Sequence, residues 1–250
     1  MEVNVAAAER QQTFRDARGP GTIVFDPARL RQAGPALLDP AHYGGGSAQP
    51  VSSGGRGAAW FVRGGFGDAV LRHYRRGGLA AKLSRDRYLW LGESRVRSLQ
   101  EFRLLGELRA QGLPVPAPLL AGYWRQGLGY RAAILVERIA DVRALADWLG
   151  PRADAAPWEA VGTMLARFHR AGVEHADLNA HNVLVDGAGR PWLIDFDRGR
   201  RRAPADAWRQ ANLDRLARSM AKLSAGAAGW QAGFGRLVAA YQQAYGEATS

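Results

Sequence analysis

The pattern of hydrophobic and polar positions differs between the two halves of the chain. In the first half, short apolar runs separated by turns are typical of strands, and the two runs on either side of the glycines at 64–67 predict a hairpin. The predicted strands span residues 22–25, 58–62, 69–74, 119–124 and 132–137. Apart from the first of these strands, the residues before position 50 carry only a weak pattern.

One amphipathic helix is predicted among these strands, at residues 94–111. Its apolar side chains recur at every third position from Val96 to Leu108, and Gly112 with the prolines at 114–118 ends the run. The helix therefore has one apolar face that can pack on the neighbouring strands.

Helical patterns dominate the second half of the chain. Helices are expected at residues 158–171, about 207–223 and 230–246, and short strands at 182–185 and 192–194. A β-rich half followed by an α-rich half predicts an α+β chain of two lobes with a cleft between them. We place the first lobe at residues 1–137 and the second at 138–250.

Composition excludes several classes of protein. The chain of 250 residues is 47% hydrophobic and 23% charged, which is ordinary for a globular protein, and it has no cysteine for a disulfide, a thiolate metal site or a cysteine nucleophile. No apolar run is long enough for a transmembrane helix, and the first ten residues do not resemble a secretory signal peptide.

The charge is strongly positive. The formal net charge is +11, and of the 34 basic residues only Lys82 and Lys222 are lysines. Such a surface attracts nucleic acid, an anionic membrane or a polyanionic substrate, and composition alone does not choose among them.

The candidate chemistry lies in one loop and the strand that follows it. The run His175-Ala-Asp177-Leu-Asn-Ala-His-Asn182 precedes Ile194-Asp195-Phe196, and a short hairpin would bring Asn182 and Asp195 side by side. An amide oxygen and a carboxylate suit Mg²⁺, and phosphoryl transfer also needs a carboxylate near the attacking hydroxyl. We interpret Asp177 as the catalytic base and Asn182 and Asp195 as metal ligands.

Two alternative interpretations apply to this loop. Asp and Asn are also common as plain turn residues, although their joint spacing here argues against that role. His175 is expected to hold the loop in place by packing and hydrogen bonding, and neither His175 nor His181 is expected to act in the chemistry.

The candidate phosphate-binding residues lie in the first half. Gly54, Gly55 and Gly57 could place backbone amides over phosphates, although a plain hairpin turn would have the same composition. On the strand that follows, Arg72 occupies the position of the phosphate-binding lysine of kinases, and Glu101 on the predicted helix is its natural ion-pair partner. The alternative for Glu101 is a solvated helix carboxylate.

These residues together resemble those of the lipopolysaccharide-kinase family, the branch of the protein-kinase-like fold that includes bacterial 3-deoxy-D-manno-octulosonic acid (Kdo) kinases. The resemblance covers about residues 50–200 and is most specific in the arginine-rich stretch after the strand. It is carried by residues 70–79, 88–90, 101–105, 175–182 and 194–197.

The resemblance implies a two-lobed protein-kinase-like fold with a β-rich first lobe and a reduced α-helical second lobe. It also implies phosphorylation by ATP and Mg²⁺ of the 4-hydroxyl of a Kdo residue on a lipid A precursor, by a peripheral enzyme at the cytoplasmic face of the inner membrane. Arg72 in place of lysine fits this branch. Asp197 follows Phe196 where protein kinases have glycine, and no role is assigned to it. Lys82 could assist Arg72 in binding phosphate, although its spacing does not require this.

The arginines Arg198, Arg200, Arg201 and Arg202 directly follow the predicted metal carboxylate and suit an anionic glycolipid acceptor. Together with Arg75, Arg76, Arg85 and Arg87 they could rest on an anionic leaflet, and the alternative for each of them is a solvated loop. Two other functions remain as alternatives. The first is a phosphotransferase for another small hydroxyl compound. Such compounds are usually cationic and call for an acidic pocket, so the basic loop after Asp195 argues against this alternative. A non-catalytic kinase-like module that binds nucleic acid or membrane would have no use for Asp177, Asn182 and Asp195 together.

Overall fold

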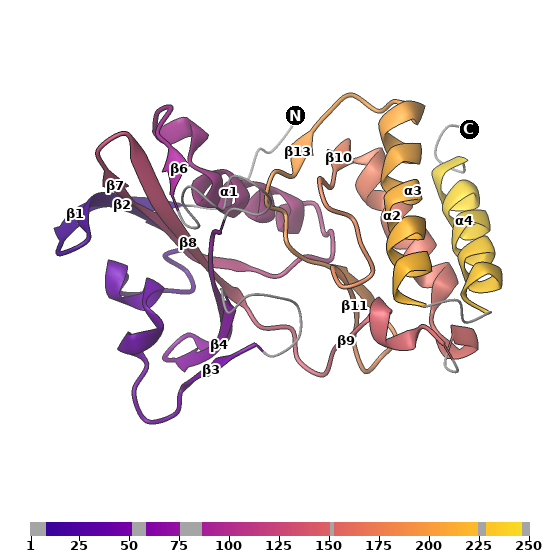
Figure 1. Cartoon of the computed structure of the whole chain (residues 1–250), viewed down its shortest axis with the longest axis horizontal. Coiled ribbons are helices and arrows are strands. Elements are labelled where there is room, and N and C mark those ends of the chain that lie inside the picture. Colours follow the sequence, from indigo (N-terminus) through magenta and orange to yellow (C-terminus); the bar gives the residue numbers. More distant parts are fainter. Residues whose placement is uncertain (1–8, 52–58, 76–86, 151–152, 225–228, 247–250) are drawn as a thin grey trace. The chain divides into compact units, whose positions relative to one another are not determined.

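The computed structural model describes residues 9–51, 59–75, 87–150, 153–224 and 229–246. The chain divides into two compact units. We call residues 1–111 and 116–138 the sheet unit, and residues 112–115 and 139–250 the helical unit. Each is described by itself (Figure 1).

The described residues of the sheet unit form one eight-stranded antiparallel sheet. The strand order is β1-β2-β7-β8-β5-β4-β3, and β6 pairs with β8 beyond the end of β5. The strands are β1 (Arg10–Asp16), β2 (Gly19–Phe25), β3 (Ala48–Pro50), β4 (Ala59–Gly64), β5 (Gly67–His73), β6 (Tyr88–Leu89), β7 (Pro118–Gln126) and β8 (Gly129–Glu137). Every strand predicted in this part of the chain is present. No pattern predicts β1, because its residues are mostly polar and exposed.

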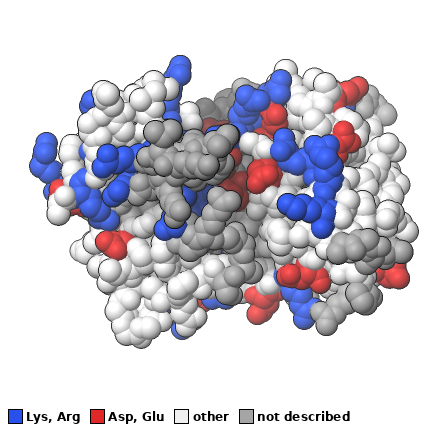
Figure 2. All heavy atoms as spheres, viewed as in Figure 1, with Lys and Arg blue, Asp and Glu red and all other residues white. Residues whose placement is uncertain are grey.

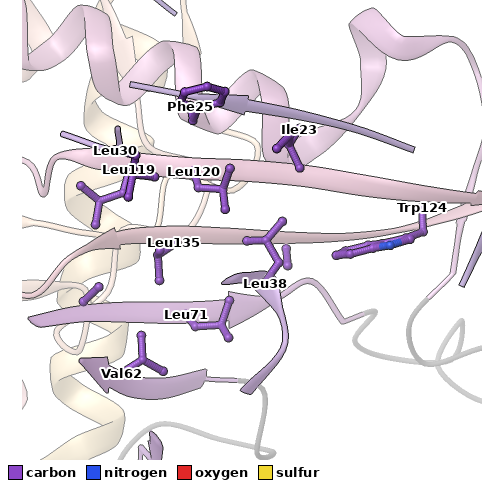
Figure 3. Packing of buried hydrophobic residues seen from close by; sticks show 12 residues of the cluster. Ile23, Phe25, Leu30, Leu38, Val62, Leu71, Leu119, Leu120, Trp124 and Leu135 are labelled. Carbon is purple, nitrogen blue, oxygen red and sulfur yellow. The ribbon is translucent and has the colours of Figure 1, made fainter. Parts of the chain in front are cut away.

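The hydrophobic core of the sheet unit gathers on β2, β5, β7 and β8 (Figure 3). Leu71, Leu120 and Leu135 come from three neighbouring strands and meet Leu38 of the 3₁₀ helix η1 (Pro35–Leu38). Leu119 and Leu120 are consecutive yet both fully buried, because a register shift between Pro118 and Leu120 turns both side chains into the core.

Helix α1 (Arg97–Ala110) packs on β7 and β8 and confirms the predicted helix, three residues later than its expected start. The hydroxyl of Ser98 donates to the carbonyl of Gly122 on β7 at 3.0 Å. A Cβ at Gly122 would lie 2.8 Å from Cδ1 of Leu38 and 2.9 Å from Cγ2 of Ile23, so a larger residue would require these side chains to shift.

The helical unit contains α2 (Trp158–Arg170), α3 (Asp206–Leu223) and α4 (Trp230–Gly246), close to the predicted bounds. Its small sheet has the order β12-β11-β9, and a separate pair joins β10 to β13. These strands are β9 (Arg143–Ala144), β10 (Val173–Glu174), β11 (Val183–Val185), β12 (Pro191–Leu193) and β13 (Arg200–Arg201). Within the described ranges, no helix combines the length and apolarity needed to cross a bilayer.

Close approach of α2 and α4 depends on two glycines. A Cβ at Gly162 would lie 2.1 Å from the carbonyl oxygen of Leu237, and a Cβ at Gly233 would lie 2.2 Å from the ring of Trp158. Both distances are far below a van der Waals contact, so the two helix backbones meet where side chains are missing. Trp158 is fully buried in the resulting contact.

We expect the helical unit to lose stability in mild acid because of His169 on α2. This side chain is buried, its Nδ1 lies 2.9 Å from the hydroxyl of Tyr241, and burial lowers its pKa to about 4. The unfolded chain binds a proton on this residue below its ordinary pKa of about 6.5, whereas the folded chain does not until about pH 4. The free energy of unfolding should therefore fall by about 3 kcal/mol between these two pH values.

Urea unfolding across this pH range measures the effect, and His169→Gln is the matched variant because it keeps a polar side chain that does not titrate. The variant should have a shallower dependence on pH than the parent chain. An equal slope in both proteins would assign the acid sensitivity to other groups.

Candidate active site

The predicted site residues fall into two groups, one in each unit. Asp177, Asn182 and Asp195 belong to the helical unit, whereas Arg72 and Glu101 belong to the sheet unit. Gly54, Gly55, Gly57 and Lys82 lie outside the described residues, as do Arg76 and Arg85.

The hairpin of β11 and β12 brings two of these residues together. Val183 pairs with Leu193, so the next pair along the ladder is Asn182 with Ile194, and the amide of Ile194 donates to the carbonyl of Asn182 at 3.0 Å. Asp195 is the residue directly after this bond. The backbone therefore places Asn182 and Asp195 at the same end of the hairpin, as the sequence pattern predicts.

The side chain of Asn182 is oriented by the loop at residues 175–182. It is buried, and its Nδ2 donates to the carbonyl of Asp177 at 2.9 Å. Because a carbonyl only accepts hydrogen bonds, this contact fixes the amide group of Asn182 and turns its Oδ1 away from the loop backbone. The Oδ1 of Asn182, which accepts hydrogen bonds and does not donate them, is thus presented at the end of the hairpin.

His175 holds the loop in one conformation. Its Nε2 lies 3.0 Å from the carbonyl of Ile194, and its Nδ1 accepts from the amide of Asp177 at 3.2 Å. These contacts require a neutral ring with its proton on Nε2. Burial lowers the pKa of His175, which favours the same neutral form. The ring also packs edge-on against Phe196, with centroids 4.8 Å apart.

Two asparagines that the sequence pattern does not single out complete the loop. Asn212 on α3 is buried, accepts from the amide of His175 at 3.1 Å and donates to its carbonyl at 3.1 Å. Asn179 accepts from the amides of His181 and Asn182 and donates to the carbonyl of Asp177. Asn179 could be found from its place inside the motif, but nothing in the sequence connects Asn212 to His175.

The carboxylate of Asp177 carries no structural hydrogen bond among the described residues, in contrast to its backbone. The residue is exposed, its amide donates to His175, and its carbonyl accepts from Asn179 and Asn182. The loop thus fixes the backbone at Asp177 and leaves the carboxylate available to an incoming group. This arrangement suits a general base.

Asp195 has an unusual backbone conformation. Its φ is 62°, in the left-handed region that residues other than glycine rarely adopt, and its Oδ1 accepts from the amide of Asp197 at 3.4 Å. Arg198, three residues later, has a φ of 65°. Such conformations cost free energy and concentrate at functional sites, where they aim a side chain.

The predicted ion pair between Arg72 and Glu101 is present in the sheet unit. Nη2 of Arg72 on β5 lies 2.6 Å from each carboxylate oxygen of Glu101 on α1. The hydroxyl of Tyr74 also donates to Glu101, and the guanidinium lies 5.0 Å from the centre of the Tyr74 ring. Only 3% of the Glu101 side chain is exposed, so it is not a solvated helix carboxylate.

The arginines after Asp195 are partly neutralised within the helical unit. Arg200 and Arg202 both donate to Glu174, at 2.8 and 3.0 Å, and hydrogen bonding to Arg200 lowers the pKa of this carboxyl. Arg201 donates to the carbonyl of Ala171 at 2.6 Å. The sequence pattern predicts one cationic group from these arginines. The pairing of β10 with β13 places the acidic residue Glu174 among them.

A second group of basic residues lies on α3, where the sequence pattern does not point. Basic side chains gather over β13 and along α3 in Figure 2. The exposed basic residues of α3 follow helical spacing and so share one face: Arg215, Arg218 and Lys222.

The donor set at the end of the β11–β12 hairpin fits a magnesium ion. Mg²⁺ is usually held by one or two protein oxygens, with waters and substrate phosphates as its other ligands. Asn182 and Asp195 offer an amide and a carboxylate from adjacent chain segments. The described residues contain no cluster of three His, Cys, Asp or Glu that could form an all-protein metal site. This pair of protein oxygen ligands suits a cation that enters the site bound to phosphate.

Loss of the Arg72 side chain should destabilise the sheet unit, and the same variant tests the predicted phosphate-binding role of Arg72. Arg72→Ala removes a charged partner from the buried Glu101 carboxylate, which should lower the free energy of unfolding by about 3 kcal/mol. We also expect a higher KM for ATP, with Arg72→Lys between the variant and the parent chain because it keeps the charge but not the planar fork. Urea unfolding and initial rates measure the two effects.

Arg63→Ala is the matched control, because Arg63 forms an exposed pair with Asp68 on the same hairpin. It should leave both stability and KM unchanged. If Arg72→Ala resembled this control, the ion pair would have neither the structural nor the phosphate-binding role.

Comparison with known proteins adds an independent finding. The family model described as lipopolysaccharide kinase (Kdo/WaaP) family matches residues 45–241. A protein named 3-deoxy-D-manno-octulosonic acid kinase from Stenotrophomonas maltophilia is 56% identical over 245 residues, which cover 97% of this chain and 98% of the relative. A protein of the same name from Xanthomonas oryzae is 54% identical over 246 residues, covering 98% of each.

Proposed function

This chain belongs to the lipopolysaccharide kinase (Kdo/WaaP) family, and from that premise we propose which reaction it catalyses and with which residues. It is a phosphotransferase that acts on Kdo in lipopolysaccharide core biosynthesis. We propose that the phosphoryl donor is ATP with Mg²⁺ and that the acceptor is the 4-hydroxyl of a Kdo residue on a lipid A precursor.

The register of the β11–β12 hairpin carries this proposal. It brings Asn182 and Asp195 to one end of the hairpin, and the hydrogen bond from Asn182 to the carbonyl of Asp177 joins that end to the loop that bears the base. A turn-forming role alone would not require Asn182 to be buried and fixed in this way. The arrangement supports Asp177 as base and Asn182 and Asp195 as metal ligands.

In the proposed reaction, the acceptor oxygen attacks the γ-phosphorus of ATP as the bond to the β–γ bridging oxygen breaks, and ADP leaves. Asp177 takes the proton of the acceptor hydroxyl. Asn182 and Asp195 would hold Mg²⁺, which neutralises the charge that develops on the phosphate oxygens. His175 stays neutral and positions the backbone of Asp177.

In the sheet unit, we propose that Arg72 binds ATP phosphate and that Glu101 positions it. The two short contacts from Nη2 to the Glu101 carboxylate, and the burial of that carboxylate, support a fixed guanidinium. We further propose that the sheet and helical units are the two lobes of a kinase-like fold. The role of Gly54, Gly55 and Gly57 over the phosphates stays a prediction, since they lie outside the described residues.

We propose that the acceptor is an anionic glycolipid met at the cytoplasmic face of the inner membrane. Arg198 and the α3 residues Arg215, Arg218 and Lys222 are exposed cations of the helical unit, and guanidinium groups suit carboxylates and phosphates. The same basic surface argues against a small cationic acceptor.

The proposal is tested by incubating the chain with Mg-ATP and a Kdo-bearing lipid A precursor and by measuring the glycolipid mass. One phosphate should be added, and fragmentation should place it on the Kdo residue at its 4-hydroxyl. A phosphate on the lipid A part, or no added phosphate beside an active control kinase, would overturn the proposed acceptor.

A further inference from the structure

The end of the sheet at the β7–β8 turn carries three exposed leucines. The residues Leu89, Leu91 and Leu128 are 59%, 57% and 84% exposed. Leu89 pairs with Gly129, and the amide of Trp90 donates to the carbonyl of Leu128 at 2.9 Å, so the three residues occupy adjacent chain segments. We call Leu89, Leu91 and Leu128 the leucine edge.

The fold holds these leucines outward. Side chains alternate along the extended segment at β6, and Tyr88 and Trp90 point to the interior side, where their rings lie 5.5 Å from Tyr130 and 5.1 Å from Tyr123. Leu89 and Leu91 are therefore on the opposite side. Turning them inward would flip Tyr88 and Trp90 out of the aromatic cluster, so their exposure is built into the register.

Cationic side chains flank the leucine edge. Arg15, Arg87 and Arg125 are exposed on the neighbouring segments, and the Arg125 guanidinium lies 5.0 Å from the centre of the half-buried Trp90 ring. Figure 2 shows basic side chains around this end of the sheet unit.

The acidic groups near the leucine edge are engaged within the sheet unit. Asp16 pairs with Arg18, and Glu93 accepts from Tyr123 and Thr22. The local surface is therefore apolar at its centre and positive around it.

We propose that the leucine edge inserts shallowly into an anionic bilayer, with the flanking arginines on lipid phosphates. Leucines gain free energy on leaving water, tryptophan favours the interfacial region, and basic residues near an anionic surface add electrostatic attraction. A second copy of the chain is a poorer partner, because it would bring the flanking arginines of two molecules together. The inference rests on the proposed function only in that a glycolipid acceptor requires a nearby bilayer.

Sedimentation with sucrose-loaded vesicles of phosphatidylethanolamine and phosphatidylglycerol tests the inference, without ATP or acceptor. The variant Leu89→Gln/Leu91→Gln/Leu128→Gln should bind at least about tenfold more weakly than the parent chain. Leu223→Gln is the matched control, because Leu223 is 39% exposed on α3 of the helical unit. It should bind like the parent, and vesicles of phosphatidylcholine alone should bind both proteins weakly.

Equal vesicle binding by the triple variant and the parent would overturn the inference, as would no binding by the parent. A parent chain that dimerises in analytical ultracentrifugation and becomes monomeric in the triple variant would instead assign the leucine edge to self-association. Because acceptor and ATP are absent, these results stay readable if the proposed acceptor is wrong. The rate of phosphoryl transfer to a deacylated, water-soluble Kdo acceptor should be equal in the triple variant and the parent. This measurement separates membrane binding from catalysis.

Discussion

Replacing Asp177 with Asn is expected to lower the kcat for phosphoryl transfer by about 100-fold or more, the contribution typical of a general base. The amide is nearly the same size as the carboxylate but does not accept the proton of the acceptor hydroxyl. The free energy of unfolding should change by less than about 0.5 kcal/mol, because the carboxylate is exposed and the described hydrogen bonds at this residue all use its backbone.

The matched control is Asp214→Asn, which makes the same chemical change at an exposed position on α3 of the same unit. It should leave kcat unchanged. Initial rates at saturating ATP, with urea unfolding of both variants, give the comparison. Near-parental kcat in Asp177→Asn would remove Asp177 from the chemistry and leave it a turn residue.

Local patterns were sufficient to predict most of the fold. Alternating and helical apolar positions indicate the main strands of the sheet and the α-helices α1 to α4, because each such element must bury one face. The same reasoning predicts the β11–β12 hairpin, and with it the meeting of Asn182 and Asp195. The pairing of Arg72 with Glu101 is predicted from the match of this strand to the lysine-bearing strand of kinases, and the structure contains it.

The features that the sequence did not predict depend on contacts between distant segments. Asn212 contacts His175 although it lies 37 positions later in the chain, and nothing in its local sequence indicates this contact. Strand β1 is mostly exposed, and β6 has only two residues, so neither leaves a periodic pattern. Glu174 neutralises part of the arginine run only because β10 pairs with β13.

Replacing Asp195 with Asn is expected to lower kcat by about 1000-fold, because several kcal/mol of charge stabilisation is the usual contribution of a catalytic metal ion. Asn tolerates the left-handed backbone at this position, where φ is 62°, so the variant should remain as stable as the parent. Asp195→Ala should be as inactive and also less stable by about 1 kcal/mol, because alanine is strained in that conformation.

Binding of a fluorescent ATP analogue, titrated with and without Mg²⁺, separates the metal-binding role of the Asp195 carboxylate from the backbone role of this residue. The parent chain should bind the analogue more tightly with Mg²⁺, and both variants should lose most of that gain because the remaining amide of Asn182 carries no charge to balance the cation. Urea unfolding should distinguish Asn from Ala, whereas the nucleotide titration should not. If Asp195→Asn kept both the Mg²⁺-dependent gain and a kcat within tenfold of the parent, the carboxylate would not be a metal ligand, and the strained backbone would serve only the turn between Ile194 and Phe196.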